Sequence, residues 1–269
     1  MIDNDVAQSL VTLVAGLVTV VVLMGACLAL AIRQRQLTVV DTVWGLGFVA
    51  IAVVSVFVAD QGDGMPGPAA LLLVLVGVWG VRLAVHLHLR NRGKGEDPRY
   101  AQMAESDGRS FATVALRRVF VPQGVAMFLV ATPVMVGMNN EGFLAPLAWL
   151  GVLVWAVGFV FEAVGDWQLK EFKKDPQNQG QVMDRGLWRY TRHPNYFGDA
   201  CVWTGVWLVA ASSLPGIATV LSPIAMTIFL TKVTGAALNE KGMRSSKPGY
   251  EAYVRRTSGF IPLPPRRAR

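Results

Sequence analysis

The sequence predicts an all-α integral membrane protein with seven transmembrane helices, its N-terminus outside and its C-terminus in the cytosol. Hydrophobic residues make up 53% of the chain and charged residues 16%, respectively above and below the shares of an average soluble domain. Apolar stretches long enough to cross a bilayer as helices recur along the chain. Lys and Arg gather on one side of these stretches, which indicates the orientation.

Seven apolar stretches have spanning or near-spanning length. A helix rises about 1.5 Å per residue, so about twenty residues cover the roughly 30 Å hydrocarbon core. The first stretch follows acidic residues and does not end in a small-residue cleavage site, so we expect it to remain as a helix rather than to be a cleaved signal. Within a single domain of residues 1–269, the predicted helices lie at about 7–32, 39–59, 69–88, 119–138, 143–168, 195–213 and 215–238.

The positive charges orient these helices. With the N-terminus outside, the outer segments 1–6, 60–68, 139–142 and 213–216 contain no Lys or Arg. All 25 Lys and Arg then lie in inner segments, in the C-terminal tail or within helices, as the positive-inside rule requires. We therefore expect an integral membrane protein whose basic segments face the cytosol. Its net charge of +7 reflects this topology and contact with anionic lipid, and no nucleic-acid partner is expected.

Three polar segments are expected on the cytosolic face: 89–118, 169–194 and 239–269. The segment 89–118 is too polar to span a membrane and too long for a simple connection, so it should carry structure of its own. Together the three segments can roof a site between helix ends. A ligand site on this face is therefore the first place to look for function.

Two common motifs are discounted. GLGFVA at 45–50 matches a dinucleotide-binding pattern, but that motif acts at a strand-to-helix turn, whereas here it lies within an apolar helix, where small residues favour close helix packing. The three histidines and the two cysteines, Cys27 and Cys201, show no metal-ligand spacing. No metal site is expected.

The fifth predicted helix carries a line of ionisable residues. Glu162, Asp166, Lys170 and Lys173 are spaced by four, four and three residues, so they lie along one face of a helix. One explanation is a ladder of charge pairs that stabilises an exposed helix end. Glu162 favours a functional explanation, because it lies within the apolar stretch, where an ionisable side chain is costly.

The stretch GLWRYTRHPNYFGD at 186–199 places another polar cluster at the start of the sixth predicted helix. Pro194 suits the first helical turn, and Asn195 and Asp199 then share a face one turn into the membrane, beside Tyr196. A helix start offers free N–H groups and a positive dipole end, so with Arg192 and His193 it could cradle a phosphate or carboxylate. The alternative is a helix cap within an aromatic and basic interfacial belt, which does not explain Asn195 and Asp199 together.

This stretch also carries a family resemblance. GLWRYTRHPNYFGD, preceded by FKKDPQNQGQVMDR and followed by KPGYEAYVRRTSGFIPLPP, resembles the bacterial DUF1295 membrane proteins, which belong with the steroid 5-alpha-reductase C-terminal domain. DTVWGLGF at 41–48 and VRLAVHLHLRNRGKGEDPRY at 81–100 are also similar to that group. The resemblance implies a seven-helix enzyme of the bacterial inner membrane that holds NADPH between its helices at the cytosolic face, with a lipidic substrate that enters from the bilayer.

The resemblance also implies a set of cofactor-binding residues. In the steroid reductases the position of Glu162 is an asparagine and both lysine positions are arginines, so this pocket should be more acidic and should grip phosphate less well in a bidentate manner. With the basic and aromatic neighbours of the sixth-helix motif included, the predicted cofactor-binding residues are Glu162, Asp166, Lys170, Lys173, Arg192, His193, Asn195, Tyr196 and Asp199.

The catalytic residues match this group less well. The steroid enzymes resemble each other in using a buried Glu on the second helix and a Tyr on the third, and neither has a counterpart here. The candidates are Asp41, His86 and His88, of which His88 could act as a general acid because a histidine pKa lies near neutral. We expect an NADPH-dependent reductase of a C=C bond in an apolar, lipid-like substrate, without steroid specificity.

Two other classes stay open. RHPNYFGD also resembles membrane methyltransferases that act on isoprenylcysteine and phospholipid amines, whose similar motif helps to hold S-adenosylmethionine. Those enzymes usually carry a pair of glutamates after the last helix, whereas this chain has NEK at 239–241, where only Glu240 matches. The third class is a lipid-binding protein that is not an enzyme. The sequence gives no indication of an oligomeric state.

Overall fold

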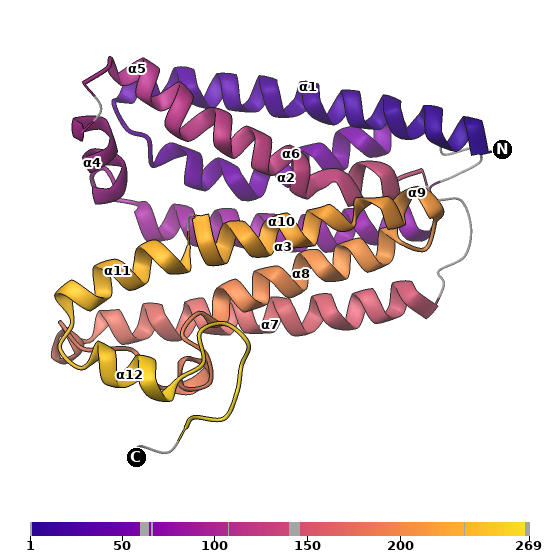
Figure 1. Ribbon diagram of the computed structural model, residues 1–269. Coiled ribbons are helices and arrows are strands. Elements are labelled where there is room, and N and C mark those ends of the chain that lie inside the picture. The colour runs from indigo at the N-terminus through magenta and orange to yellow at the C-terminus, as the bar shows by residue number, and fades with distance from the viewer. Residues whose placement is uncertain are drawn as a thin grey trace. The chain divides into compact units, whose positions relative to one another are not determined.

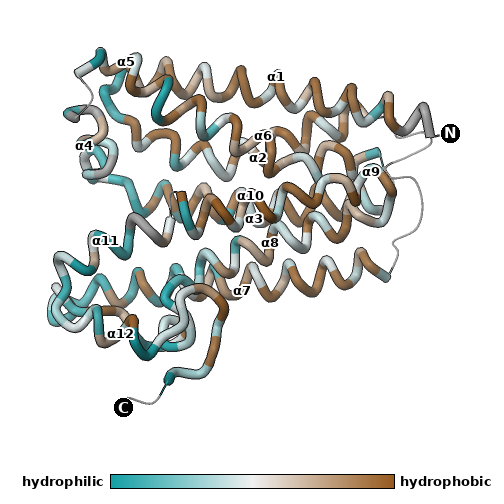
Figure 2. The backbone as a smooth tube through the Cα atoms, in the orientation of Figure 1, coloured by the Kyte–Doolittle hydropathy of each residue, from teal (hydrophilic) through white to brown (hydrophobic). Residues whose placement is uncertain are grey.

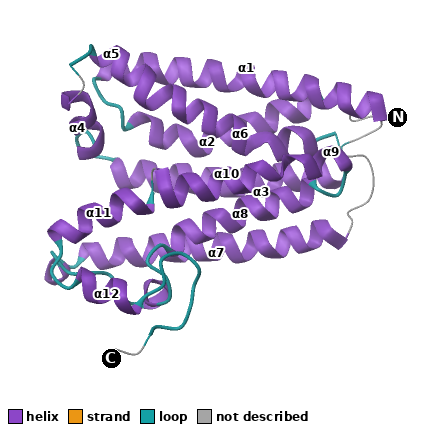
Figure 3. Ribbon diagram, in the orientation of Figure 1, coloured by secondary structure: helices purple, strands orange, loops and turns teal. Residues whose placement is uncertain are grey.

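A computed structural model describes residues 2–59, 65, 67–106, 108–139, 146–233 and 235–266. Every regular element in these residues is a helix, and the described part contains one isolated bridge, between Thr191 and Ser258 (Figure 3). The predicted all-α class is therefore confirmed. Three acidic residues of the predicted outer segments, Asp60, Asp63 and Glu141, lie outside the described residues.

Six helices or helical runs in the described ranges are long and apolar enough to cross a membrane. The sixth predicted stretch, 195–213, is not among them and forms α8 (Pro194–Ala210), whose 17 residues give a length of about 26 Å at 1.5 Å per residue. Seven spans therefore stay a prediction. The six candidate spans are Val6–Gln34, Val39–Val58, Gly67–Asn91, Phe111–Gly137, Pro146–Lys174 and Leu214–Val233.

Several helices run beyond the apolar stretches that predict them. The helix predicted over 143–168 is α7 (Pro146–Lys174), which continues into the polar segment because that segment is rich in good helix formers. Figure 2 shows this change from brown to teal along α7.

The helix predicted over 215–238 is instead a series of short elements. These are α9 (Leu214–Ile217), η4 (Ala218–Val220), α10 (Leu221–Ile228) and η5 (Phe229–Val233).

The chain divides into two compact units, and each is described by itself. The first unit comprises Met1–Trp149 and Val206–Ser222, and the second comprises Leu150–Gly205 and Pro223–Arg269. The candidate cofactor residues all belong to the second unit, and the candidate catalytic residues all belong to the first. The single domain over residues 1–269 stays a prediction.

The first unit packs four long helices on one another. Its core consists of fully buried large side chains, among them Phe48, Trp79 and Met127, with the rings of Phe48 and Trp79 5.5 Å apart. Burial of apolar area stabilises such a core by roughly 25 cal/mol per Å². The helices of this unit are α1 (Ile2–Gln34), α2 (Val39–Val58), α3 (Gly67–Asn91), α4 (Pro98–Ser106), α5 (Phe111–Val114), η1 (Ala115–Phe120) and α6 (Val121–Gly137).

The GLGFVA motif serves this helix packing. A Cβ on Gly45 of α2 would collide with the backbone carbonyl of Gly80 on α3, and a Cβ on Gly47 would lie 2.5 Å from the Met127 side chain. Glycine at both positions therefore lets neighbouring helices approach closely. This is the packing role that the sequence predicts for the motif.

The second unit is built on a glycine seam between α7 and α8, which run antiparallel side by side (Figure 1). A Cβ on Gly158 would lie 2.5 Å from the Gly198 carbonyl oxygen, and one on Gly205 would lie 2.5 Å from the Gly151 carbonyl oxygen. At the other end of the seam, Gly165 faces Pro194. The spacing is seven residues on both helices, which keeps the small residues on one helix face. The two backbones therefore touch along the seam.

The C-terminal elements of the second unit wrap around the residues before α8. They are α11 (Ala236–Ser246), α12 (Tyr250–Arg256) and an extended tail, and the residues before α8 include η2 (Pro176–Asn178) and η3 (Gly186–Arg189). The backbone N–H of Arg192 donates to the Ser258 carbonyl at 2.9 Å, and that of Leu263 donates to the Tyr190 carbonyl at 3.0 Å. These bonds hold residues 192–194, Arg-His-Pro, in place, and we call these residues the RHP segment.

Candidate functional site

The glycine seam brings polar residues of α7 and α8 together at the start of α8. Because Gly165 packs against Pro194 and Gly198 packs against Glu162, the polar face of α7 meets the first turn of α8. The Asn195 Nδ2 donates a hydrogen bond to Asp166 Oδ1 at 3.1 Å. Two residues predicted to share a cofactor site are thus in direct contact.

Three carboxylic acids are buried in these two helices. Glu162 is 4% exposed, Asp166 is 9% exposed and Asp199 is 8% exposed. Burying a carboxyl group is costly unless it is hydrogen-bonded or paired. Three buried carboxyl groups on two neighbouring helices are therefore unusual, and such groups often mark a functional site.

One buried acceptor at this site has no donor. The Asn195 Oδ1 atom is buried and accepts no hydrogen bond from the described residues. Leaving a buried polar atom unsatisfied costs about 1–3 kcal/mol, and a bound ligand with an N–H or O–H donor would remove that cost. The amide is already oriented by Asp166, so its oxygen points in a fixed direction.

The two lysines of the α7 line lie elsewhere. Lys170 and Lys173 are both exposed, at the polar end of the helix. The line predicted from spacing therefore divides into a buried acidic half, Glu162 and Asp166, and a solvated basic half. Only the acidic half meets α8.

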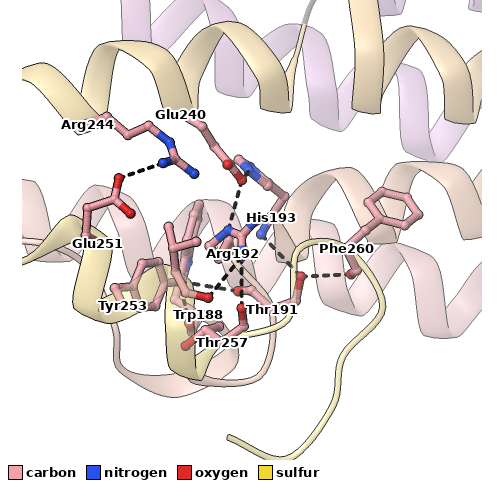
Figure 4. A network of polar contacts seen from close by, with 11 residues as sticks. Trp188, Thr191, Arg192, His193, Glu240, Arg244, Glu251, Tyr253, Thr257 and Phe260 are labelled. Carbon is pink, nitrogen blue, oxygen red and sulfur yellow. Dashed lines mark hydrogen bonds and ion pairs between the residues drawn. The ribbon is translucent and has the colours of Figure 1, made fainter. Parts of the chain in front are cut away.

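The two basic residues before α8 are engaged by Glu240 of α11 (Figure 4). Arg192 Nε donates to Glu240 Oε1 at 2.9 Å, and His193 Nε2 lies 2.9 Å from the same oxygen. Arg192 Nη1 also donates to the carbonyl oxygens of Thr257 at 2.9 Å and Val254 at 3.4 Å. The Nε and Nη1 donors of Arg192 are therefore both bound to other residues of the protein.

These contacts set the charge of Glu240. Burial alone would raise its pKa, but hydrogen bonds from His193 and Arg192 outweigh burial and lower the pKa from 4.5 to about 2. His193 is only 2% exposed. The network is therefore a partly buried, ionised carboxylate held by two basic side chains.

Tyr196 extends the network along α8. Its ring stacks on His193 with centroids 5.4 Å apart, and its hydroxyl oxygen accepts a hydrogen bond from Asn239 Nδ2 at 2.8 Å. Asn239 and Glu240, the first two residues of NEK, thus contact adjacent parts of the RHPNY sequence. The two segments that the methyltransferase resemblance pairs are neighbours in space.

Further contacts fix the loop that precedes the RHP segment. Tyr253 donates its hydroxyl proton to the Trp188 carbonyl at 2.6 Å, and the Trp188 indole N–H donates to the Gly165 carbonyl of α7 at 3.0 Å. Thr191 Oγ1 donates to the Phe260 carbonyl at 2.8 Å. The start of α8 is therefore held from α7 on one side and from the C-terminal segment on the other.

Sequence reasoning missed the positioning roles of Glu240, Tyr253 and the glycine seam. Glu240 had a signal in the sequence, because an acid directly after an apolar stretch can pair with a basic segment on the same face of the membrane. The glycine seam also had a signal in the sequence, namely the spacing of seven residues between the glycines at 151, 158 and 165 and between those at 198 and 205. The pairing of Tyr253 with Trp188 is a contact between distant segments that spacing does not reveal.

The candidate catalytic residues lie in the first unit. Asp41, in the first turn of α2, accepts hydrogen bonds from the Tyr100 hydroxyl at 3.0 Å and from Asn91 Nδ2 at 3.4 Å, and pairs with Arg90 at 3.4 Å. His86 is partly buried and His88 is exposed. The structure thus adds Tyr100, from the short helix α4, to the acid that the sequence singles out.

These features define a helical membrane protein with a buried polar site at the start of α8, and comparison with known proteins gives its family. Residues 27–257 match the model of the DUF1295 family, described as "Protein of unknown function (DUF1295)". The chain belongs to this family.

A second comparison found a partial relative. The chain is 33% identical over 79 residues to the "Probable O-methyltransferase ustE" of Ustilaginoidea virens, which is 29% of this chain and 28% of that protein. The matched region thus spans about a quarter of either chain. No solved structure matches.

Proposed function

We propose that this protein is a membrane-embedded, NADPH-dependent reductase of a C=C bond in an apolar, lipid-like substrate. Seven helices cross a bacterial inner membrane, with the N-terminus outside, and the cofactor binds on the cytosolic side at the start of α8. Family membership and the apolar helices support the membrane setting. The polar contacts of α7 and α8 support the cofactor site.

The observation that carries this proposal is the Asn195–Asp166 pair. Asp166 orients the amide through the 3.1 Å hydrogen bond, and the buried Asn195 Oδ1 is left to accept one from a ligand. A carboxamide N–H or a ribose hydroxyl of NADPH would satisfy it. The buried acids Glu162 and Asp199 can accept hydrogen bonds from further ribose hydroxyls.

In this proposal, one group of residues binds the cofactor and another group supplies the proton. NADPH, when bound, would supply a hydride to one carbon of the double bond, and the protein must supply a proton to the substrate. Asn195 and Asp166 bind and orient the cofactor. Asp41, His86 and His88 stay the candidate proton donors, joined by the Tyr100 hydroxyl that hydrogen-bonds to Asp41.

A second candidate is an S-adenosylmethionine-dependent membrane methyltransferase. It is favoured by the partial relative named as a probable O-methyltransferase and by the contacts of Glu240 with Arg192 and His193. Buried carboxylates would also suit the positively charged sulfonium cofactor. The two candidates use the same pocket and differ in the ligand that it takes.

Cofactor titration separates the two candidates. We expect NADPH to raise the unfolding temperature of the purified, detergent-solubilised protein, because a ligand at 100 times its Kd stabilises the native state by about 2.7 kcal/mol. Asn195→Ala should abolish this shift, whereas the exposed-site control Gln177→Ala should retain it. A shift with S-adenosylmethionine alone would overturn the reductase in favour of the methyltransferase, and no shift with either would overturn both.

Cysteine labelling tests the proposed orientation. In a background that lacks Cys27 and Cys201, we expect Gln61→Cys to react with a membrane-impermeant maleimide on intact cells, because the segment 60–68 holds no Lys or Arg. Gln177→Cys should react only after permeabilisation. The opposite pattern would place the candidate site on the outer face and contradict the topology.

A further inference from the structure

Because Glu240 binds Arg192 and His193, these two residues are not available to neutralise the phosphates of a cofactor. A nucleotide with several phosphate oxygens needs cations or N–H donors, and the buried part of the α7–α8 site is acidic. Cations or N–H donors that bind the phosphates must therefore lie elsewhere in the second unit. A cleft in that unit offers such a place.

This cleft lies between the loop after α7 and the start of α12. Its volume is about 700 Å³, and its lining residues come from 179–185 and 248–256. Gly180 and Gly249 contribute bare backbone to its walls, with φ of 77° and 84°, and a Cβ on either would meet no other atom within 4 Å. The space above both glycines is therefore open to a ligand.

Basic side chains surround the cleft. Arg185 and Arg256 line it, and Lys247, next to the lining residue Pro248, donates to the Gln181 carbonyl. Arg256 is ion-paired with Asp184, which leaves an excess of positive charge. Burial lowers the pKa of Lys247, so this part of the surface is partly shielded from water.

Arg185 is the cation best placed to bind a ligand. Its guanidinium carbon lies over the Phe172 ring, 5.9 Å from the centroid, a cation–π contact that favours this position of the side chain. Arg185 makes no ion pair within the described residues. Arg185 is exposed. An arginine that lies over an aromatic ring without an ion-pair partner keeps its forked N–H groups available for two phosphate oxygens.

The cleft is connected to the cofactor site through α7. The Leu187 backbone N–H donates to Gln168 Oε1 at 2.9 Å, and Trp188 donates to the Gly165 carbonyl, so the turn after Arg185 is fastened to the helix that carries Asp166. Phe172, under Arg185, lies six residues beyond Asp166, about 9 Å along the helix axis. A dinucleotide is long enough to reach both places.

We propose that this cleft is a phosphate-binding site, with Arg185 as the principal ligand, and that it takes the adenosine 2′-phosphate of NADPH. The inference rests on the proposed function and deepens it, because it makes the enzyme select NADPH over NADH. The phosphate is a dianion with three acceptor oxygens, which matches an arginine fork, a second guanidinium and a nearby ammonium. NADH lacks this group.

The test measures the Kd of NADPH, NADH, adenosine 2′,5′-bisphosphate and inorganic phosphate for the purified full-length protein. In Arg185→Gln the Kd of NADPH and of the bisphosphate should rise about tenfold or more, since a hydrogen bond to a charged group is lost, while that of NADH stays unchanged. Arg189→Gln removes an exposed charge from the same segment outside the lining and should change neither. Unfolding temperatures of both variants should equal that of the unchanged protein.

The outcomes separate this inference from the proposed function. If Asn195→Ala abolishes NADPH binding but Arg185→Gln does not weaken it, the reductase proposal holds and the phosphate site is wrong. The same conclusion follows if Arg185→Gln weakens NADPH and NADH equally. If the bisphosphate or inorganic phosphate binds in an Arg185-dependent manner while NADPH does not, the site is real and the reductase proposal fails. If no phosphate compound binds, the site is overturned.

Discussion

Replacing Gly198 with leucine is expected to destabilise the protein by about 3 kcal/mol, at the upper end of the range for overpacked cores. A Cβ on Gly198 collides with the backbone N–H of Glu162 and lies 2.5 Å from the Gly158 carbonyl oxygen. Backbone atoms cannot move aside as a flexible side chain can, so α7 and α8 must separate. Chemical unfolding in detergent would measure the loss.

The matched control is Gly77→Leu in α3, because a Cβ at Gly77 meets no other atom within 4 Å. We expect this variant to be as stable as the unchanged protein. Gly198→Leu should in addition lose any cofactor-induced stabilisation, since the separation pulls Asn195 away from Asp166. Equal stability of the two variants would show that the glycine seam does not hold the helices together.

Replacing Glu240 with alanine should produce the second large effect, about 2–3 kcal/mol. It removes the carboxylate that holds Arg192 and His193, and hydrogen bonds between charged groups of this kind are worth about 1.5–3 kcal/mol. The basic side chains would then lose their partner in a mostly buried position. Thermal unfolding of the purified protein would measure the change.

The control for this variant is Glu251→Ala. Glu251 pairs with Arg244, but their side chains are 55% and 47% exposed, and surface pairs contribute little, about 0–1 kcal/mol. We expect a change within that range. If Glu251→Ala were as damaging as Glu240→Ala, the importance of Glu240 would lie in general charge balance rather than in its contacts with the RHP segment.

The lowered pKa of Glu240 gives this prediction a pH dependence. The group has a pKa near 4.5 without its partners and about 2 in the folded protein, so the folded state favours the ionised form. Its stabilisation is therefore fully present above about pH 4.5 and is lost as the pH falls from there towards 2. Glu240→Ala should lack this part of the acid sensitivity, so the two stability curves should converge in acid.

Much of the fold can be predicted from the sequence, because a membrane imposes a long apolar run on every spanning helix. The helix over 39–59 is reproduced by α2 almost to the residue. The single helix predicted over 215–238 differs from the observed series of short helical elements. Hydropathy shows which residues are suited to lipid, but it does not show where one helix type changes to another. The described run ends at Val233, and α11 begins directly after Gly235, whose φ of −92° and ψ of −93° are not helical.

The candidate site was predicted in part. Helical spacing placed Asp166 and Asn195 on polar faces, and their hydrogen bond joins two residues that the sequence assigns to one site. Spacing within a helix cannot say which faces of two helices meet, so the separation of Lys170 from this pair was not foreseen. The contact of Arg192 with Glu240 joins residues 48 apart, and only the folded chain brings them together.

The bond from Thr191 to the carbonyl of Phe260 also sets an order of events during synthesis. The two residues are 69 positions apart, and a ribosome adds about 5–20 residues per second, so roughly 3–14 s separate their emergence. The segment before α8 is therefore synthesised several seconds before Phe260, whose carbonyl accepts the hydrogen bond from Thr191. A chain that stalls or is cut before residue 260 would carry all six candidate spans and yet lack the hydrogen bond that holds Thr191 from the C-terminal side, so the polar C-terminal segment completes the support of the candidate site last.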